Sequence, residues 1–139
     1  MWLDWGGKFV LKGVMSVGDA RRAADVGVGG IMVSNHGGRQ LDGSRAPFDQ
    51  LAEIVDAVGD RMEVILGGGV RRGTHVLKAL SPGAKAVSGR RLYLYALAAT
   101  GQPGVERAQG LLEAEIVRGM KLMGVTRIDR LGRDNLRRH

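Results

Sequence analysis

The fold is decided by one stretch of the chain, which reads GIMVSNHGGRQLDG over residues 30–43. Its first four residues form an apolar run that is typical of the end of a buried strand, and a glycine-rich loop follows. The loop carries His36 and Arg39. A neutral imidazole can accept a proton near neutral pH, and a guanidinium can hold a carboxylate through two parallel hydrogen bonds. The stretch therefore predicts a strand whose carboxyl end supports proton and anion chemistry.

The same alternation of short apolar runs and longer helical segments extends over the whole chain. We expect strands at residues 9–12, 30–34, 63–66 and 84–88. Helices are expected from Ser16, a favourable N-cap, to about residue 26, and at residues 47–58, 72–80, 92–99 and 105–123. Strands that alternate with helices predict parallel βα units. This pattern leaves two α/β folds open, a doubly wound open sheet and a (β/α)8 barrel of roughly 250 residues.

The composition is that of a single globular unit over residues 1–139, with 44% apolar residues and no cysteine. Disulfide and thiolate chemistry are therefore excluded. No apolar run reaches the roughly 18 residues of a membrane span, and the first residues lack the features of a signal peptide, so we expect a cytoplasmic location. No group of His, Asp and Glu has metal-ligand spacing, and we expect no metal.

The net charge of +7 is concentrated near the C-terminus, where residues 118–139 contain seven Lys or Arg and only two Asp. Such a segment can contact nucleic acid or anionic lipid. No aromatic residue is interleaved with these charges, which argues against a platform for stacking single-stranded bases. We expect a solvated terminal segment and no nucleic-acid partner.

Chemically capable residues follow each of the four expected strands. They are Lys12, residues 34–39, residues 67–72 and residues 88–91. In βα-repeat proteins the carboxyl ends of the strands meet on one face, so these residues are expected to form one site. The loop GGGVRRG at residues 67–73 opens a helix, and free backbone N–H groups there favour a phosphate. Arg71 and Arg91 add positive charge, whereas His75 is expected to be an exposed helix residue.

Together these motifs resemble the FMN-dependent α-hydroxy acid dehydrogenase and oxidase family, which includes flavin-type L-lactate dehydrogenase, glycolate oxidase and mandelate dehydrogenase. The resemblance rests on residues 33–43, on VLKG at 10–13, on GGGVRRGT at 67–74, and on GAKAV and YLYAL at 83–87 and 93–97. It covers nearly the whole chain but less than half of the family's catalytic domain, and only its C-terminal part.

The resemblance selects between the two folds. It implies a (β/α)8 TIM barrel, with this chain as the C-terminal half-barrel of about four βα units, strands five to eight. A half-barrel leaves two strand edges unpaired, which is a liability for solubility. We therefore expect a fragment, a truncated gene product or half of an assembly, and a homo-oligomer is one way to cover those edges.

The resemblance also implies roles for individual residues. His36 would be the catalytic base and contact the cofactor, and Arg39 would bind the substrate carboxylate. Cofactor binding would further involve Lys12, which faces the flavin ring near N1 and O2, and Ser34, Gly67, Gly68, Gly69, Arg71, Arg90 and Arg91. The implied reaction oxidises an L-2-hydroxy acid, most directly L-lactate, to the 2-oxo acid with two electrons passing to FMN. The electron acceptor and the choice between carbanion and hydride routes stay open.

Two residues depart from the family's pattern. Gly67 stands where the family usually has an aspartate that would bind the ribityl hydroxyls, and Arg90 stands where it usually has glycine. We expect Gly67→Asp combined with Arg90→Gly to tighten FMN binding.

Two other functions stay open at this point. The chain could be a non-catalytic half-barrel that binds FMN weakly or not at all. It could also belong to a different FMN- or phosphate-binding barrel enzyme, which would use residues 67–72 and Arg91 equally well. Such an enzyme would not need His36 and Arg39 at their spacing.

Overall fold

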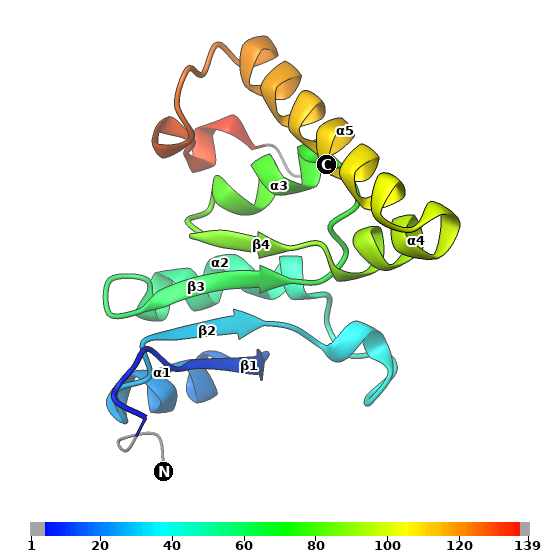
Figure 1. Ribbon diagram of the computed structural model, residues 1–139. Helices are drawn as coiled ribbons and strands as arrows, with labels where there is room; N and C mark the ends of the chain where they lie inside the picture. The colour runs from blue at the N-terminus through cyan, green and yellow to red at the C-terminus, as the bar shows by residue number, and fades with distance from the viewer. Residues whose placement is uncertain (1–4, 137–139) are drawn as a thin grey trace.

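The computed structural model describes residues 5–136 and contains one four-stranded parallel sheet with a helix after each strand (Figure 1). The strands are β1 (Val10–Val14), β2 (Gly30–Val33), β3 (Glu63–Gly67) and β4 (Ala86–Ser88). The α-helices are α1 (Val17–Asp25), α2 (Pro47–Val58), α3 (Gly73–Leu80), α4 (Arg90–Thr100) and α5 (Gln102–Leu122). Short 3-10 turns are η1 (His36–Gly38), η2 (Ile128–Arg130) and η3 (Arg133–Asn135).

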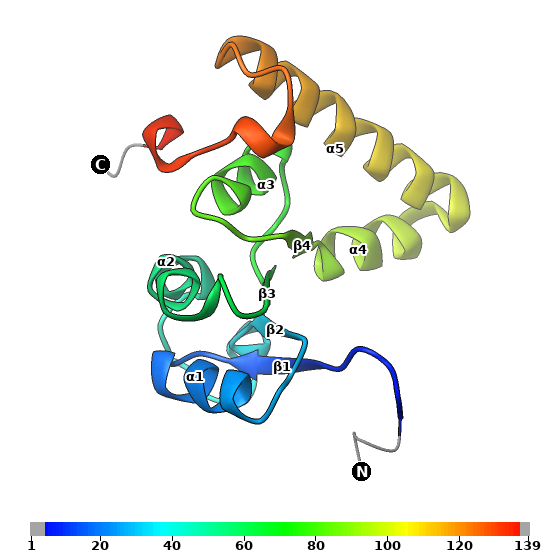
Figure 2. The ribbon, with the colours of Figure 1, turned by 90° about the vertical axis from the view of Figure 1, so that its left-hand side faces the viewer.

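The order of the strands settles which α/β fold is present. The strands lie side by side in chain order, β1-β2-β3-β4, and all three neighbouring pairs are parallel. A doubly wound sheet reverses its strand order at a switch point and carries helices on both faces. Here α1, α2 and α3 cover one side of a curved sheet (Figure 2). These are four consecutive βα units of a barrel, as the resemblance implies.

The core lies between the sheet and these outer helices. Alternate residues of the central strands point toward α2 because successive side chains of a strand face opposite sides. The side chains of α2 that pack against the sheet are spaced three and four residues apart, so they lie on one face of the helix. The fully or almost fully buried side chains are Ile31, Val33, Val64 and Leu66 of the sheet and Leu51, Ile54 and Val58 of α2. The carboxyl ends of the strands lie beyond this layer and are left for the site.

The ends of the elements follow local sequence signals with small shifts. Ser16 caps α1, because its side chain accepts a hydrogen bond from the backbone N of Asp19 at 3.0 Å. Pro47 begins α2, where its fixed φ suits the first turn. Helix α4 begins at Arg90, two residues before the expected start, because Gly89 serves as its N-cap. Arg90 and Arg91 therefore lie in the first turn of a helix.

The C-terminal segment returns to the body of the molecule. Arg133 in η3 forms an ion pair with Asp56 of α2, and Arg127 pairs with Asp129 at 2.7 Å. These ion pairs neutralise part of the positive charge of the C-terminal segment. In residues 5–136, no helix combines the length and apolar character that a membrane crossing requires.

Helix α5 holds the start of α3 in place through Glu115. The carboxylate accepts hydrogen bonds from the backbone N of Gly73 at 2.7 Å and from Nε of Arg72 at 2.8 Å. Arg72 is the N-cap of α3 and provides no capping bond itself, so a residue 42 positions away supplies the cap. The hydrogen bond from Gly73, followed by the contact with Arg72, holds the pKa of Glu115 below its usual range.

Glu115→Gln should lower the melting temperature at neutral pH, because the amide keeps an acceptor oxygen but loses the charge. A carboxyl with a lowered folded-state pKa stabilises the fold above its unfolded value, about 4.3, and loses that contribution as the pH falls through the folded value. The gap in melting temperature between parent and variant should therefore close below about pH 4, in thermal unfolding followed by circular dichroism. Glu113→Gln, on the same helix, is the control. A gap independent of pH would refute this role for the charge.

Candidate active site

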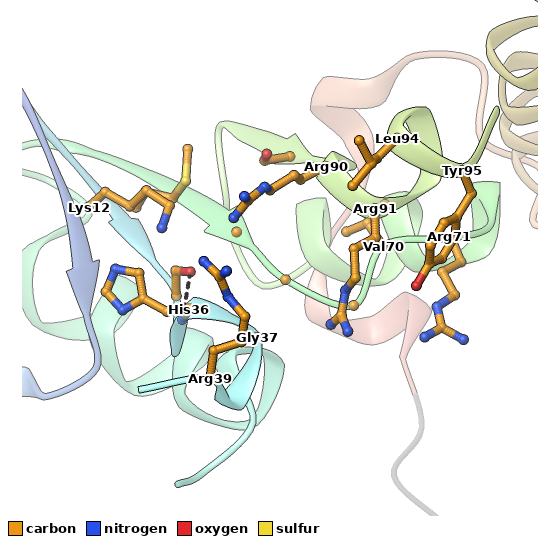
Figure 3. Close-up of a pocket in the computed structure, with 16 residues that line it drawn as sticks. Lys12, His36, Gly37, Arg39, Val70, Arg71, Arg90, Arg91, Leu94 and Tyr95 are labelled. Carbon is orange, nitrogen blue, oxygen red and sulfur yellow. Dashed lines mark hydrogen bonds between the residues drawn. The ribbon is translucent and has the colours of Figure 1, made fainter. Parts of the chain in front are cut away.

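A cavity of about 240 Å³ opens where the four strands end (Figure 3). The structure brings together there every residue that the sequence predicts for the site, namely Lys12, Ser34, His36, Arg39, Gly67, Gly68, Gly69, Arg71, Arg90 and Arg91. Gly37, Val70 and Ser88 also line the cavity and fall within the segments expected to form the site, whereas Met32, Leu94 and Tyr95 were not predicted. Tyr95 and Leu94 belong to α4.

The charge of this cavity has one sign. Five cationic side chains line it, and none of the lining residues is Asp or Glu. No ion pair within residues 5–136 involves any of the five, which are Lys12, Arg39, Arg71, Arg90 and Arg91. The adjacent Arg72 shows the contrast, since its guanidinium is bound to Glu115. A concave surface with unpaired positive charge attracts anionic ligands.

The cations divide between the two ends of the cavity. Figure 3 shows Arg90 extending toward the end where Lys12, His36 and Arg39 lie. Arg71 extends toward the opposite end, near Tyr95, whereas the guanidinium of Arg91 lies beside Gly37, where a Cβ atom would be 3.7 Å from its Nη2 (Figure 3). The neighbours Arg90 and Arg91 thus point in different directions, although both are predicted to contact the cofactor. The cavity can hold an anionic group at each end.

The loop that carries His36 has a strained backbone. His36 has a φ of +56°, and it is the only non-glycine residue with a left-handed backbone in residues 5–136. Gly37 and Gly38 follow with φ of +75° and +76°. Two side chains hold this turn: the Ser34 hydroxyl accepts from the N of His36 at 3.3 Å, and the Asn35 carbonyl accepts from the N of Gly37 at 3.0 Å. Such strain, typically about 1–3 kcal/mol, is found mainly at functional sites.

The glycine-rich loop after β3 has a contact that the sequence did not predict. The Nδ1 of His75, in the first turn of α3, lies 3.3 Å from the backbone N of Arg71 and 3.2 Å from the carbonyl O of Gly69. When it carries no proton, Nδ1 accepts a hydrogen bond from the Arg71 N–H. His75 is only partly exposed, so the expectation of a plain surface histidine is wrong. It fastens the loop to the helix that follows.

The wall of the cavity beside Gly67 is apolar. A Cβ atom on Gly67 would lie 2.7 Å from both Cγ and Sδ of Met32, on the neighbouring strand. The thioether therefore fills the space that a side chain at position 67 would need. The missing aspartate has left no hole, and any carboxylate placed there must first displace Met32.

Comparison with known proteins agrees with this geometry. The chain matches the model of the family described as FMN-dependent dehydrogenase over residues 2–138. It is 48% identical over 133 residues to a protein named L-lactate dehydrogenase from a Caulobacter species, covering 96% of this chain and 35% of that protein. It is 54% identical over 117 residues to a protein named pre-mycofactocin synthase from Mycobacterium tuberculosis, covering 83% and 30%.

Solved structures give the same result. The structure described as the monotopic membrane protein (S)-mandelate dehydrogenase is 41% identical and superposes with a TM-score of 0.91, over 95% of this chain and 35% of that one. The chain thus spans about a third of the length of the relatives that it matches. The predicted barrel fold is confirmed, as is the predicted family. This chain belongs to the FMN-dependent dehydrogenases, a family of oxidoreductases whose cofactor is FMN.

Proposed function

We propose that the protein oxidises an L-2-hydroxy acid, most directly L-lactate, to the 2-oxo acid, and that it passes two electrons to FMN. The observation that carries this proposal is the single cavity that joins a histidine on a strained loop to five unpaired cations. A small hydroxy acid is the partner that this charge and this base suit. The cytoplasmic location stays a prediction, since one similar structure is described as a monotopic membrane protein.

The lining residues fit a flavin phosphate. Arg71 lies at one end of the cavity, Arg91 lies between the glycine-rich loop and Gly37 of η1, and neither forms an ion pair within residues 5–136. Guanidinium groups and free backbone N–H groups together suit a phosphate dianion. FMN supplies the two-electron acceptor when bound. Lys12 lies at the other end, where its ammonium would stabilise negative charge on the ring.

The substrate would bind near η1. Arg39 would hold the substrate carboxylate, and its planar fork fixes the acid in one orientation. The imidazole of His36, three residues earlier on the same loop, would take a proton from the substrate. Arg90 extends into this end of the cavity, so we assign it to the anionic substrate or ring and not to the phosphate.

The alternative of a non-catalytic half-barrel is supported by one observation. Each outer strand of the sheet, β1 and β4, has a partner on only one side within residues 5–136. The colour of the purified 139-residue chain distinguishes the two functions: a stoichiometric flavin spectrum, bleached by L-lactate, supports the enzyme. A colourless chain that gains no spectral change with added FMN supports the half-barrel.

His36→Asn should abolish most of the flavin reduction in the full-length protein. Asparagine tolerates the left-handed backbone of position 36, so the loop keeps its shape while the base is lost. Stopped-flow reduction by L-lactate should slow by about 10²–10⁴-fold, the usual contribution of a positioned base. FMN content should stay at the parental level. A loss smaller than tenfold would remove His36 from the role of base.

Arg91→Ala should weaken FMN binding by about tenfold or more, because a hydrogen bond to a charged group is worth roughly 1.5–3 kcal/mol. Fluorescence titration measures this, with riboflavin as the matched ligand because it lacks the phosphate. Riboflavin affinity should not change. Arg21→Ala, an exposed arginine of α1, is the control variant. Equal losses for both ligands would show that Arg91 does not bind the phosphate.

Gly67→Asp alone should destabilise the protein by about 1–3 kcal/mol, the usual cost of overpacking, because the new Cβ meets Met32. Met32→Ala should recover most of that loss in the double variant, although alone it is destabilising. Urea unfolding of the four proteins in a double-mutant cycle gives the coupling energy. Additive effects would mean that Met32 does not occupy the space. The gain in FMN affinity expected for Gly67→Asp with Arg90→Gly should appear only once Met32 is shortened.

A further inference from the structure

A bulge in β1 lies directly beside the imidazole of His36. Strand β1 pairs with β2 residue for residue up to Lys12 and Met32, and the next pair is Val14 with Val33. Gly13 is left without a partner, and its φ is +99°. A glycine suits a bulge of this kind because it adopts a positive φ without steric cost. The bulge therefore follows immediately after Lys12, at the cavity end of the strand.

The missing side chain at Gly13 is what gives the imidazole its room. A Cβ atom built there would lie 2.7 Å from Cε1 and 3.2 Å from Nε2 of His36. Real Cβ atoms essentially never approach another heavy atom to 2.7 Å. The contacted atoms belong to the imidazole of His36, a residue whose backbone has a φ of +56°. A methyl group at position 13 would therefore push the imidazole away from β1.

The orientation of this histidine has no other visible cause. Catalytic histidines are commonly oriented by a hydrogen bond to the second ring nitrogen. Within residues 5–136, no hydrogen bond reaches either ring nitrogen of His36; its backbone N donates to the Ser34 hydroxyl. The space left by Gly13 and the left-handed backbone of His36 are the features of the structure that bear on where the ring lies.

We infer that Gly13 is a positioning residue for the proposed base, acting through contact with the His36 ring. The inference rests on the proposed function of His36. Displacing a reacting group by about 1 Å can slow a reaction by about 10²-fold. Gly13→Ala should therefore reduce the rate of flavin reduction by about tenfold or more. The KM for L-lactate and the affinity for FMN should change little.

The matched control is Gly124→Ala. Gly124 has a φ of +68°, which lies in the left-handed region like the +99° of Gly13, and a Cβ atom there would meet nothing within 4 Å. This variant carries the cost of a left-handed alanine without touching the site. Its rate of flavin reduction should equal that of the parent protein. A loss as large as that of Gly13→Ala would show that backbone strain alone slows the reaction, and would overturn the inference.

A double-mutant cycle separates positioning from a general structural role. If Gly13 acts through His36, Gly13→Ala should slow the His36→Asn variant no further. Additive losses would overturn the inference. If His36→Asn itself has no effect, the proposed function fails; if it has its full effect and Gly13→Ala has none, only the inference fails.

A measurement on the parent protein tests the inference without any substitution. The Gly13 Hα protons and the His36 Hε1 proton should show a nuclear Overhauser effect, because the ring's Cε1 faces the glycine. Its presence supports the contact, and its absence in the parent protein would overturn it.

Discussion

The buried layer between the sheet and α2 is the interaction on which the rest of the structure depends, because it fixes the positions of the strand ends. Those ends bring five exposed cationic side chains to one cavity, and none of the five has an ion-pair partner within residues 5–136. The arrangement of the cations is therefore set by the strands and their loops, and not by carboxylates among them.

Two polar contacts hold the glycine-rich loop in position relative to the helices. Glu115 of α5 binds the N-terminus of α3, and His75 of α3 binds the backbone of the preceding loop. The glycine-rich loop is thus held from both its own helix and a distant one. A preorganised site of this kind loses less entropy when its anion binds. Glu115 acts on the site from outside it, and no Asp or Glu of residues 5–136 lines the cavity.

The sequence predicts local features of this protein well and long-range ones poorly. Helix α2 was predicted to the residue, because Pro47 marks its start and its apolar positions share one face. The choice between barrel and open sheet needed either the family resemblance or the strand order, which no local pattern contains. Glycine runs and charges at the strand ends predict that four segments form one site, whereas the choice of ten individual residues within them came from the family resemblance. The direction of Arg90 and the bond from Glu115 depend on contacts between distant segments, so no local signal revealed them.

The contact between Met32 and Gly67 makes these two positions interdependent. A side chain at position 67 and the present conformation of Met32 exclude each other, because the added Cβ atom would lie 2.7 Å from both Cγ and Sδ of Met32. The effect of a substitution at position 67 therefore depends on the residue at position 32. The two positions are epistatic, and this wall of the cavity has to be altered as a pair.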